Sequence, residues 1–290
     1  MSGPNASKTA VVVLRATGDL TFSALELVRV YEKIGSFGSL FSDERLISIL
    51  SSEGPLASVF VDCPLTAPPC VDCSRPSCPG AVRCEDVGVA FMLSVANRHL
   101  ARGKRKSRPV NPQSQRLWDV VQMSAGESRI PVRTEPTYSS NHAPLVVRAR
   151  TLQRRLNSLG QKGFELRETN VPAVVELLSE RYLPGSGAAA GGLPPAAAFR
   201  SFEHGLGFRQ QMVDAFLECG FLIAPEGTDG ANLDAAADVV ESLSASVEVF
   251  QALVTAIVAV LHSGHLTFPP VAGFEQAGGG WVHLPDFGKF

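Results

Sequence analysis

The stretch TAVVVL (Thr9–Leu14) indicates the fold class, because its apolar residues follow one another without polar alternation. Such a run predicts a strand that is buried on both faces of a sheet. A second run of this kind, LASVFV (Leu56–Val61), ends at Asp62. Further strands are expected at Leu20–Leu27 and Phe164–Arg167. Buried strands that alternate with helical segments predict an α/β fold, with a sheet covered by helices on both faces.

Helical patterns occupy much of the remaining chain. Ser42 has the residue type of a helix N-cap, and Asp43 and Glu44 follow it in the first turn, near the positive end of the helix dipole. The closing segment Trp281–Pro285 is expected to form a short strand or a docked tail. The other expected helices span Val87–Leu100, Ala143–Leu159, Val171–Tyr182, Ser201–Gly220 and Leu233–Leu261.

The composition is that of a globular protein. The chain has 290 residues, of which 45% are hydrophobic and 19% are charged. A formal net charge of −2 provides no global basic field, so any contact with nucleic acid must be local. The longest apolar run, Ala252–Leu261, is too short to span a bilayer, and no secretory signal is visible. We expect a cytoplasmic protein with no membrane partner and a single domain over residues 1–290. The sequence leaves the oligomeric state open.

Four of the six cysteines lie in one short loop and have the spacing C-x2-C-x4-C-x5-C: Cys70, Cys73, Cys78 and Cys84. Four thiolates in so short a segment can wrap a tetrahedral Zn²⁺, and metal binding would order a loop that has little core of its own. Free thiols and an iron–sulfur cluster are the alternatives, although the spacing matches no common ferredoxin pattern. Cys63 could replace one ligand. We therefore expect a structural zinc in a cysteine-rich and basic loop insertion, residues 63–110.

The same insertion contains the one dense basic run of the chain, residues 102–108. No aromatic residues interleave with this run, so stacking of bases is not supported. A solvated loop is the alternative to phosphate binding. A second basic set on the expected helix Ala143–Leu159, formed by Arg148, Arg150, Arg154 and Arg155, could line the same groove or face solvent. The residues expected to hold a nucleic-acid backbone electrostatically are Lys104, Arg105, Lys106 and Arg108.

Six segments form an ordered set over most of the chain. They are SGPN (Ser2–Asn5) before TAVVVL, VFVDCPLTAPP (Val59–Pro69), NPQSQRLWD (Asn111–Asp119), HAPLVVRARTLQRRL (His142–Leu156), RETNVPAVVELL (Arg167–Leu178), and VFQALVTAIVAVL (Val249–Leu261) with GGWVHLP. In this order they resemble a family of predicted nucleases, long catalogued as a domain of unknown function. The resemblance implies a ribonuclease-H-like mixed sheet flanked by helices, here with the cysteine-rich loop inserted.

The resemblance also implies two-metal hydrolysis of nucleic-acid phosphodiesters. Carboxylates from adjacent strand ends would hold two Mg²⁺ or Mn²⁺ ions roughly 3.5–4 Å apart. Asp62 ends one expected strand and Glu168 follows another, so both are expected as ligands. Family members usually read Phe-Asp-Ala in the closing helix, where this chain reads Phe250-Gln251-Ala252. Glutamine brings no charge, and Glu248, three residues earlier on nearly the same face, could partly substitute.

Family members also begin with a strand that ends in Asp immediately before the Ser-Gly-Pro turn. Met1 stands in that position here. In this fold the first strand lies in the middle of the sheet, so its loss would leave backbone groups on two neighbouring strands without partners. We therefore expect that the true start lies upstream and that Met1 is an internal methionine. The alternative is a truncated, degenerate homologue.

Each candidate acid also has a purely structural interpretation. Asp62 could cap the turn at Pro64, Glu168 could be a solvated acid that pairs with Arg167, and Glu248 could lie on an exposed helix face. The leading hypothesis is a metal-dependent nuclease with Asp62, Glu168 and Glu248 at its metal site. The alternative is a non-catalytic binding or scaffold protein that retains the ribonuclease-H-like fold with a zinc-stabilised loop.

Overall fold

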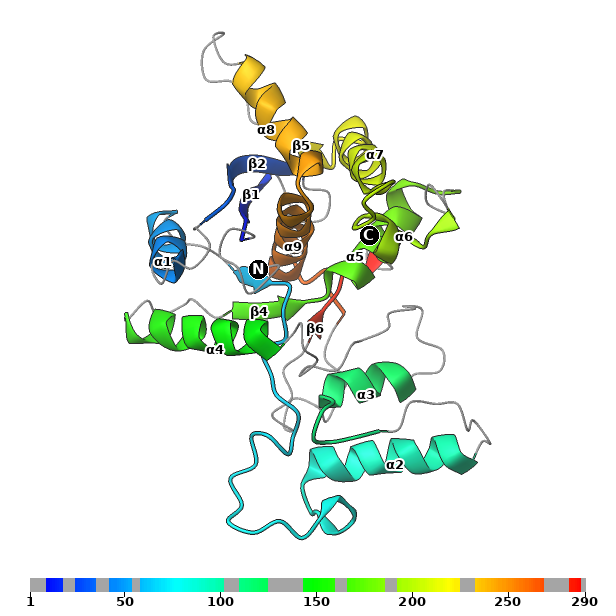
Figure 1. The fold of residues 1–290 in the computed structure, drawn as a ribbon. Coiled ribbons are helices and arrows are strands. Elements are labelled where there is room, and N and C mark those ends of the chain that lie inside the picture. The colour runs from blue at the N-terminus through cyan, green and yellow to red at the C-terminus, as the bar shows by residue number, and fades with distance from the viewer. Residues whose placement is uncertain are drawn as a thin grey trace. The chain divides into compact units, whose positions relative to one another are not determined.

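The computed structural model shows a mixed α/β chain in which helices accompany two small sheets (Figure 1). It describes residues 9–17, 24–34, 42–53, 58–101, 110–124, 143–159, 166–185, 192–224, 233–268 and 282–287.

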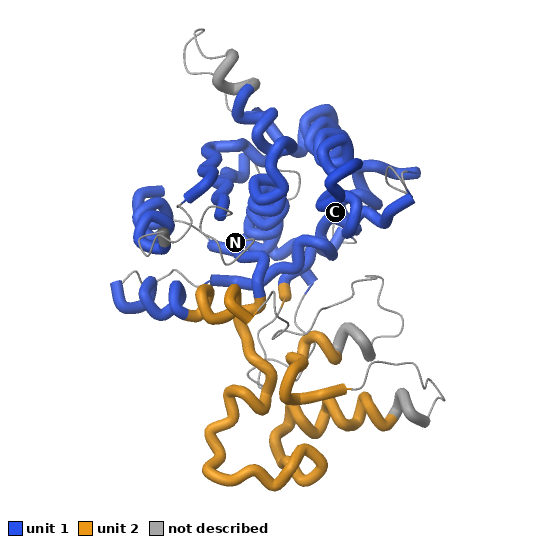
Figure 2. Tube along the Cα trace, viewed as in Figure 1, with its two compact units in different colours: residues 1–63, 151–268, 283–290 blue, residues 64–150, 269–282 orange. Residues whose placement is uncertain are grey.

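The chain forms two compact units (Figure 2). Unit 1 comprises residues 1–63, 151–268 and 283–290, and unit 2 comprises residues 64–150 and 269–282. Unit 1 contains most of the strands and the long carboxy-terminal helix. Whether the two units fold as the single domain expected from the sequence stays a prediction.

The first sheet of unit 1 has the order β1-β2-β5. Strand β1 (Val11–Thr17) pairs antiparallel with β2 (Ala24–Tyr31), and β2 pairs parallel with the short β5 (Leu222–Ile223). The sequence predicts that the TAVVVL run is buried on both faces. Within β1, however, Val12 alone is fully buried and the other residues are half-buried or exposed. The physical reason is that this strand borders a cavity, described below.

The second sheet has the order β3-β4-β6. Strand β3 (Val59–Val61) lies parallel to β4 (Leu166–Thr169), and β6 (Val282–His283) completes the sheet. The strand therefore extends two residues past the expected end at Arg167, and Phe164 and Glu165 lie outside the described residues. Glu168 lies within β4 instead of after it, because the strand continues until Asn170 caps the next helix.

Capping side chains determine where two helices of unit 1 begin. The Asn170 side chain accepts a hydrogen bond from the Ala173 amide at 3.1 Å and starts α5. Ser246 adopts an extended conformation and accepts from the Val249 amide at 3.3 Å. The expected helix Leu233–Leu261 is consequently broken at Ser246 into two helices bent by 100°. The helices are α1 (Ser42–Ser52), α5 (Val171–Tyr182), α6 (Pro195–Ala198), α7 (Gly205–Glu218), α8 (Leu233–Ala245) and α9 (Val247–Ser263), with α4 (Ala143–Ser158) spanning the boundary between the units.

Helix α9 forms the core of unit 1. It packs against β1, β2 and β3 as well as against α5 and α8, so both sheets rest on it (Figure 1). Its largely apolar sequence supplies this contact, because a helix that meets neighbours on several sides buries most of its surface. The buried apolar side chains of α9 are Val249, Phe250, Leu253, Val254, Ile257, Val258 and Leu261.

Unit 2 has a small core of its own. Helix α2 (Val87–Ala101) and α3 (Leu117–Ser124) pack together, and the short 3-10 turn η2 (Ala81–Arg83) precedes α2. The Asp86 carboxylate caps α2 by accepting from the Val89 amide at 3.0 Å. The buried residues at this contact are Met92, Val95, Leu117 and Val120.

Hydropathy along the described residues identifies no single helix that is long and apolar enough to cross a membrane. Within the described residues, the helix of residues 238–245 and α9 have the length and apolar composition of a membrane span only when they are taken together, and the two are bent relative to each other.

A buried arginine connects the helices at the start of α9. The Arg209 guanidinium of α7 donates to the carbonyls of Ser244 (2.6 Å), Phe199 (2.7 Å) and Ala245 (3.2 Å). Two of these carbonyls end α8 and have no partner within their own helix. Burial lowers the pKa of this guanidinium, and the Glu248 carboxylate counteracts the effect. Arg209 therefore satisfies the backbone where α8 turns into α9.

We expect Arg209→Met to lower the free energy of unfolding by about 3 kcal/mol, because three buried carbonyls lose their donor. Chemical denaturation followed by circular dichroism measures the change. Arg154→Met removes an exposed arginine of α4 and serves as the control, with a change within about 0.5 kcal/mol. Equal effects of the two substitutions would contradict this role of Arg209.

Candidate functional site

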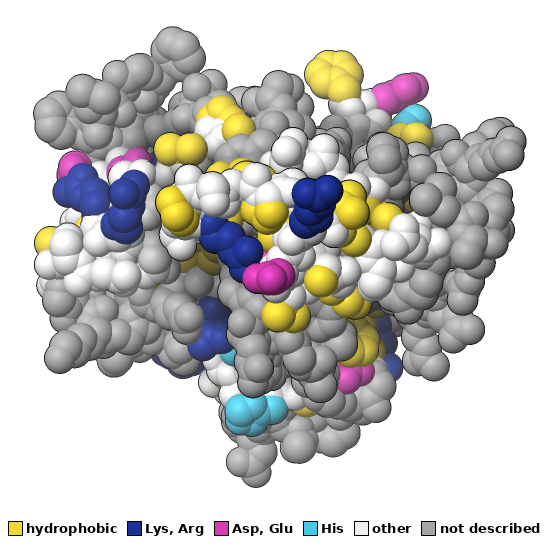
Figure 3. All heavy atoms as spheres, turned by 90° about the horizontal axis from the view of Figure 1, so that it is seen from below, with side chains coloured by type: hydrophobic (Ala, Val, Ile, Leu, Met, Phe, Trp, Pro, Cys, Tyr) yellow, Lys and Arg dark blue, Asp and Glu magenta, His cyan; other side chains and the backbone are white. Residues whose placement is uncertain are grey.

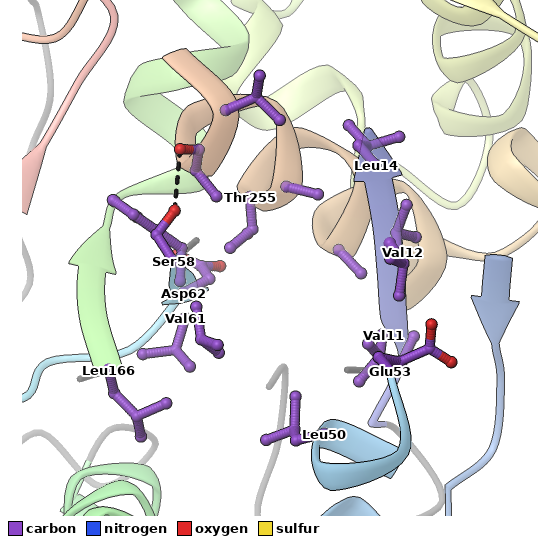
Figure 4. Close-up of a pocket in the computed structure, with 18 of the residues that line it drawn as sticks. Val11, Val12, Leu14, Leu50, Glu53, Ser58, Val61, Asp62, Leu166 and Thr255 are labelled. Carbon is purple, nitrogen blue, oxygen red and sulfur yellow. Dashed lines mark hydrogen bonds between the residues drawn. The ribbon is translucent and has the colours of Figure 1, made fainter. Parts of the chain in front are cut away.

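A cavity of about 470 Å³ lies inside unit 1, between the two sheets. Residues 9–16, which include β1, line one side, and residues 58–62, which include β3, line the other. Figure 4 shows the side chains of these strands on opposite sides of the cavity, with α9 behind them. Asp62, Glu248 and Gln251 all contribute to the lining. The structure therefore brings two of the three expected acids, together with Gln251, to one cavity.

Asp62 follows β3 directly and is engaged through both carboxylate oxygens. Its Oδ1 accepts a hydrogen bond from the Val171 amide at 3.1 Å, in the first turn of α5. An amide of this turn has no partner within its own helix, and the helix dipole favours a negative charge there. Oδ2 lies 3.5 Å from Nη2 of Arg200, and the Asp62 side chain is only 16% exposed. The carboxylate thus holds β3 against α5 and pairs with a cation.

Gln251 and Arg200 form a second contact beside Asp62. Oriented with its carbonyl oxygen toward Arg200, the Gln251 amide accepts from Nη2 at 2.5 Å and from Nε at 3.2 Å. The opposite orientation would place Nε2 at 3.5 Å from Asp62 Oδ2 but would set amide hydrogens against the guanidinium. We assign the first orientation, because it pairs a donor with an acceptor. Arg200 also lies over the Phe199 ring, 4.9 Å from its centroid.

Glu168 lies within β4 of the second sheet. In the parallel β3–β4 pair, Glu168 lies opposite Val61. Glu168 is buried but is not among the residues that line the cavity, whereas Asp62 is. Their role as metal ligands stays a prediction.

Glu248 lies in the first turn of α9 and has a local partner. The Ser246 hydroxyl is 3.1 Å from Glu248 Oε2 and donates to it, while the Ser246 hydroxyl oxygen accepts from the Val249 amide. Ser246 and Glu248 therefore cap α9 together, near its positive end. Glu248 lines the cavity, which is the position it needs if it is to substitute in part for the missing acid. It also has the structural role of capping α9.

No sequence pattern marks Arg200 or Arg209 as functional. Arg200 follows a proline- and alanine-rich segment, and Arg209 lies within an ordinary helical pattern. Their partners Asp62 and Ser244 are far away in the sequence. Arg200, near the end of a low-complexity segment, belongs to no motif with a fixed spacing. Sequence patterns therefore could not have identified it. Only the folded chain shows that one arginine neutralises the candidate acid and that the other joins α7 to the α8–α9 corner.

Within the described residues, no three side chains of His, Cys, Asp or Glu lie close enough together to hold a metal ion as they stand. The donor set for Mg²⁺ or Mn²⁺ that the family resemblance implies does not fit this arrangement. Asp62 pairs with Arg200, Gln251 is neutral, and Glu168 is not among the residues that line the cavity. Hard divalent ions require several charged or carbonyl oxygens at one point. We therefore derive no reaction step through such a metal pair.

The cysteine loop lies in unit 2, and its four thiols are free. Cys70 and Cys84 are partly buried, whereas Cys73 and Cys78 are exposed. Burial raises the pKa of the Cys70 thiol, and the nearby thiols of Cys84, Cys78 and Cys73 raise it further. As they stand in the structure, however, these described thiols do not form a group of three that could hold a metal ion. Thiolate donors suit Zn²⁺, which would remove the repulsion between them. The zinc site stays a prediction.

The basic residues expected to hold phosphates, Lys104, Arg105, Lys106 and Arg108, lie outside the described residues. On α4, two arginines are engaged in ion pairs. Arg150 pairs with Asp72 at 2.7 Å, and Arg155 makes a two-pronged contact with Glu44 of α1. On the face drawn in Figure 3, the described Lys and Arg side chains are scattered among apolar and polar ones. The described residues of this face thus form no continuous basic patch.

Phe60 of β3 forms a cluster of rings with His262 and His283, in which Phe60 and His283 are buried. The rings of His262 and His283 lie 4.3 Å apart, and Phe60 lies 5.4 and 5.3 Å from them. The Thr169 hydroxyl donates to the His283 carbonyl at 2.8 Å. Burial, reinforced by the neighbouring His262 and then by Arg167, lowers the pKa of His283 from 6.5 to about 3. His283 is therefore neutral in the folded chain at physiological pH.

Comparisons with protein-family models, with curated proteins and with solved structures find no match to this chain.

For the cysteine loop, we expect purified protein to carry about one zinc per chain, measured by inductively coupled plasma mass spectrometry under reducing conditions. Cys73→Ser together with Cys78→Ser should remove the metal, because two thiolates hold Zn²⁺ much more weakly than four. Cys219→Ser, at an exposed cysteine of unit 1, is the matched control and should retain zinc. Absence of zinc from the wild-type protein would refute the site.

For the histidine cluster, we expect the free energy of unfolding to fall as the pH decreases from about 6.5 toward 3. In this range the unfolded chain protonates His283 and the folded chain does not, so protons favour unfolding. The contribution of this residue is at most about 1.4 kcal/mol per pH unit. His283→Leu should flatten the pH profile of urea denaturation, whereas His204→Leu, at a half-exposed histidine, should leave it unchanged. Identical profiles for His283→Leu and wild type would show that His283 does not carry the effect.

Proposed function

We propose that this chain is a non-catalytic binding or scaffold protein that retains a ribonuclease-H-like arrangement. The observation that carries the proposal is the pairing of Asp62. One carboxylate oxygen caps α5 and the other pairs with Arg200, which also binds Gln251. A carboxylate that is engaged in this way has a structural role, and its charge is compensated by the protein itself.

Several features support the ribonuclease-H-like part of the proposal. Among the described strands, the antiparallel hairpin β1–β2 comes first. A helix then leads to β3, which lies parallel to β4, and a long closing helix covers both sheets. This order agrees with the segments in which the sequence resembles the predicted-nuclease family. The parallel β3–β4 pair requires a crossover connection, and α4 lies within that connection.

The nuclease hypothesis is the second candidate, and one observation favours it. Asp62 stands at a strand end and lines the same cavity as Glu248. Two carboxylates that border one cavity could approach each other if Arg200 were displaced, since Arg200 is 48% exposed and its contact with Asp62 is 3.5 Å long. An ion pair of this exposure contributes little to stability. Phosphates held by Lys104 and its basic neighbours would then bring the substrate.

The two candidates differ in a nuclease assay with Mn²⁺ on single-stranded and double-stranded DNA and RNA. We expect wild type, Asp62→Asn and Arg200→Gln to be equally inert, because Asp62 serves the fold and not a metal. In thermal denaturation, Asp62→Ala should lower the free energy of unfolding by about 1 kcal/mol, since it removes the acceptor for the Val171 amide. Mn²⁺ should stabilise no variant.

Mn²⁺-dependent cleavage by wild type that Asp62→Asn abolishes would overturn the non-catalytic proposal. Parallel purification of both proteins controls for contaminating nucleases. Arg200→Gln sharpens the comparison further. If freeing Asp62 from its cation creates Mn²⁺-dependent stabilisation that wild type lacks, then Arg200 is what keeps the metal out.

A further inference from the structure

The 283–287 segment contacts three parts of unit 1. Strand β6, which ends at His283, lies beside β4 in the second sheet (Figure 1), and the Thr169 hydroxyl of β4 donates to the His283 carbonyl at 2.8 Å. The Phe287 ring lies 6.5 Å from the ring of Tyr182 on α5, measured between centroids. The third contact is with the turn that follows α9.

Two backbone hydrogen bonds hold the segment to that turn. The Phe268 amide donates to the Leu284 carbonyl at 3.0 Å, and the Asp286 amide donates to the Leu266 carbonyl at 2.9 Å. An amide in such a bond exchanges its hydrogen with water only when the structure around it opens. The amides of Phe268 and Asp286 therefore report whether the segment is docked.

The side chain of His283 is buried in surroundings that do not suit a positive charge. The residue is only 8% exposed, and within the described residues its Nδ1 is buried and makes no hydrogen bond. The uncharged Phe60 ring of β3 lies 5.3 Å away, and the His262 ring of α9 lies 4.3 Å away. The titratable groups that act on His283 are His262 and Arg167 of β4, and both disfavour a proton on it.

We propose that His283 is a pH-sensitive latch, which holds the 283–287 segment against β4 and α9 at neutral pH and releases it when the imidazole is protonated. Histidine is the side chain that ordinarily changes charge between about pH 5 and pH 8. Release opens the edge of β4 that β6 covers and uncovers one side of the Phe60 ring. The inference goes beyond the proposed function, because it holds whether or not Asp62 takes part in hydrolysis.

The direction of the pH dependence follows from which state binds the proton. Burial, then His262 and then Arg167, lower the pKa of the docked His283 from 6.5 to about 3, whereas the released imidazole returns to its ordinary value. Well above pH 6.5 neither state is protonated, and docking has its full strength. Below this pH only the released state takes up the proton, so the ratio of released to docked segment rises about tenfold per pH unit. The rise ends near pH 3, where the docked imidazole is also protonated.

Release of the segment does not require unit 1 to unfold. Strand β3, which contains Phe60, remains paired with β4, and α9 remains packed against β1, α5 and α8. Short segments of this kind open locally with free energies well below that of global unfolding. At neutral pH the buried Leu284 and Pro285 keep the segment docked through apolar contact. A proton on His283 therefore acts on a local equilibrium.

Native-state hydrogen exchange of the full chain, followed residue by residue in NMR spectra, tests the proposal. Exchange rates at each pH are divided by the intrinsic rate at that pH, which gives the opening constant. For the amides of Phe268 and Asp286 we expect this constant to rise about a hundredfold between about pH 6.5 and about pH 4.5. Low concentrations of urea should leave it unchanged, because local release exposes little surface. Amides in the middle of α9 report global unfolding and should exchange more slowly, with a steep urea dependence.

His283→Leu removes the titrating group and keeps an apolar side chain. In this variant we expect the opening constant at the two reporter amides to stay flat over the same pH range. His204→Leu, at a half-exposed histidine outside the cluster, is the matched control and should keep the wild-type pH dependence. The wild-type series is a complete test by itself, so the proposal can be decided even if His283→Leu fails to fold.

Several outcomes would overturn the latch. Reporter amides that exchange at the rate and urea dependence of the α9 amides would show that the segment leaves only when unit 1 unfolds. An opening constant that is independent of pH, or a wild-type pH dependence in His283→Leu, would remove His283 from the mechanism. A His283 ring that titrates near pH 6.5 in the intact protein would show that docking does not exclude the proton. None of these readouts depends on nuclease activity or on a binding partner, so a failure here is separate from a failure of the proposed function.

Discussion

The packing of both sheets onto one helix is the constraint on which unit 1 depends. Helix α9 buries seven large apolar side chains, and each such side chain contributes on the order of 1.5–3 kcal/mol when removed from water. Because β1 and β3 contact α9 and do not pair with each other, the helix holds the two sheets in place. The cavity between the strands follows from this arrangement. The polar contacts of Arg209 and Ser246 set the point at which α9 begins, and hence which residues face each sheet.

The same geometry determines the chemistry available at Asp62. Its position after β3 places the carboxylate at the amino end of α5, where an unpaired amide and the helix dipole attract it. Arg200 supplies the compensating charge from the turn that follows α6. A nuclease of the two-metal kind needs that charge for its ions. An acid that satisfies the fold in this manner, next to a neutral Gln251, is better suited to positioning backbone than to binding cations.

Local patterns in the sequence predicted most elements, and the failures have identifiable physical causes. The limits of α5 match the expected Val171–Tyr182, because Asn170 and the proline that follows form a strong start signal. The end of the preceding strand, β4, was expected two residues too early, because the only local signal for that end is the same Asn170 cap. The break at Ser246 was missed because the residues on both sides continue one apolar pattern. Asp62 was recognised as a candidate, whereas Arg200 was not, because ion pairing across the chain leaves no periodic signal.

The sequence by itself determined the α/β class, the positions of the main helices, the grouping of four cysteines and the interest of Asp62. These properties depend on short-range preferences such as hydrophobic period, capping and spacing, which any stretch of chain expresses locally. Only the tertiary structure decided that Asp62 borders the cavity and Glu168 does not, that Arg200 pairs with Asp62, and that β1 and β3 line one cavity beside α9. Those outcomes depend on pairing register and on contacts between distant residues, and a single sequence does not specify them before the chain has folded.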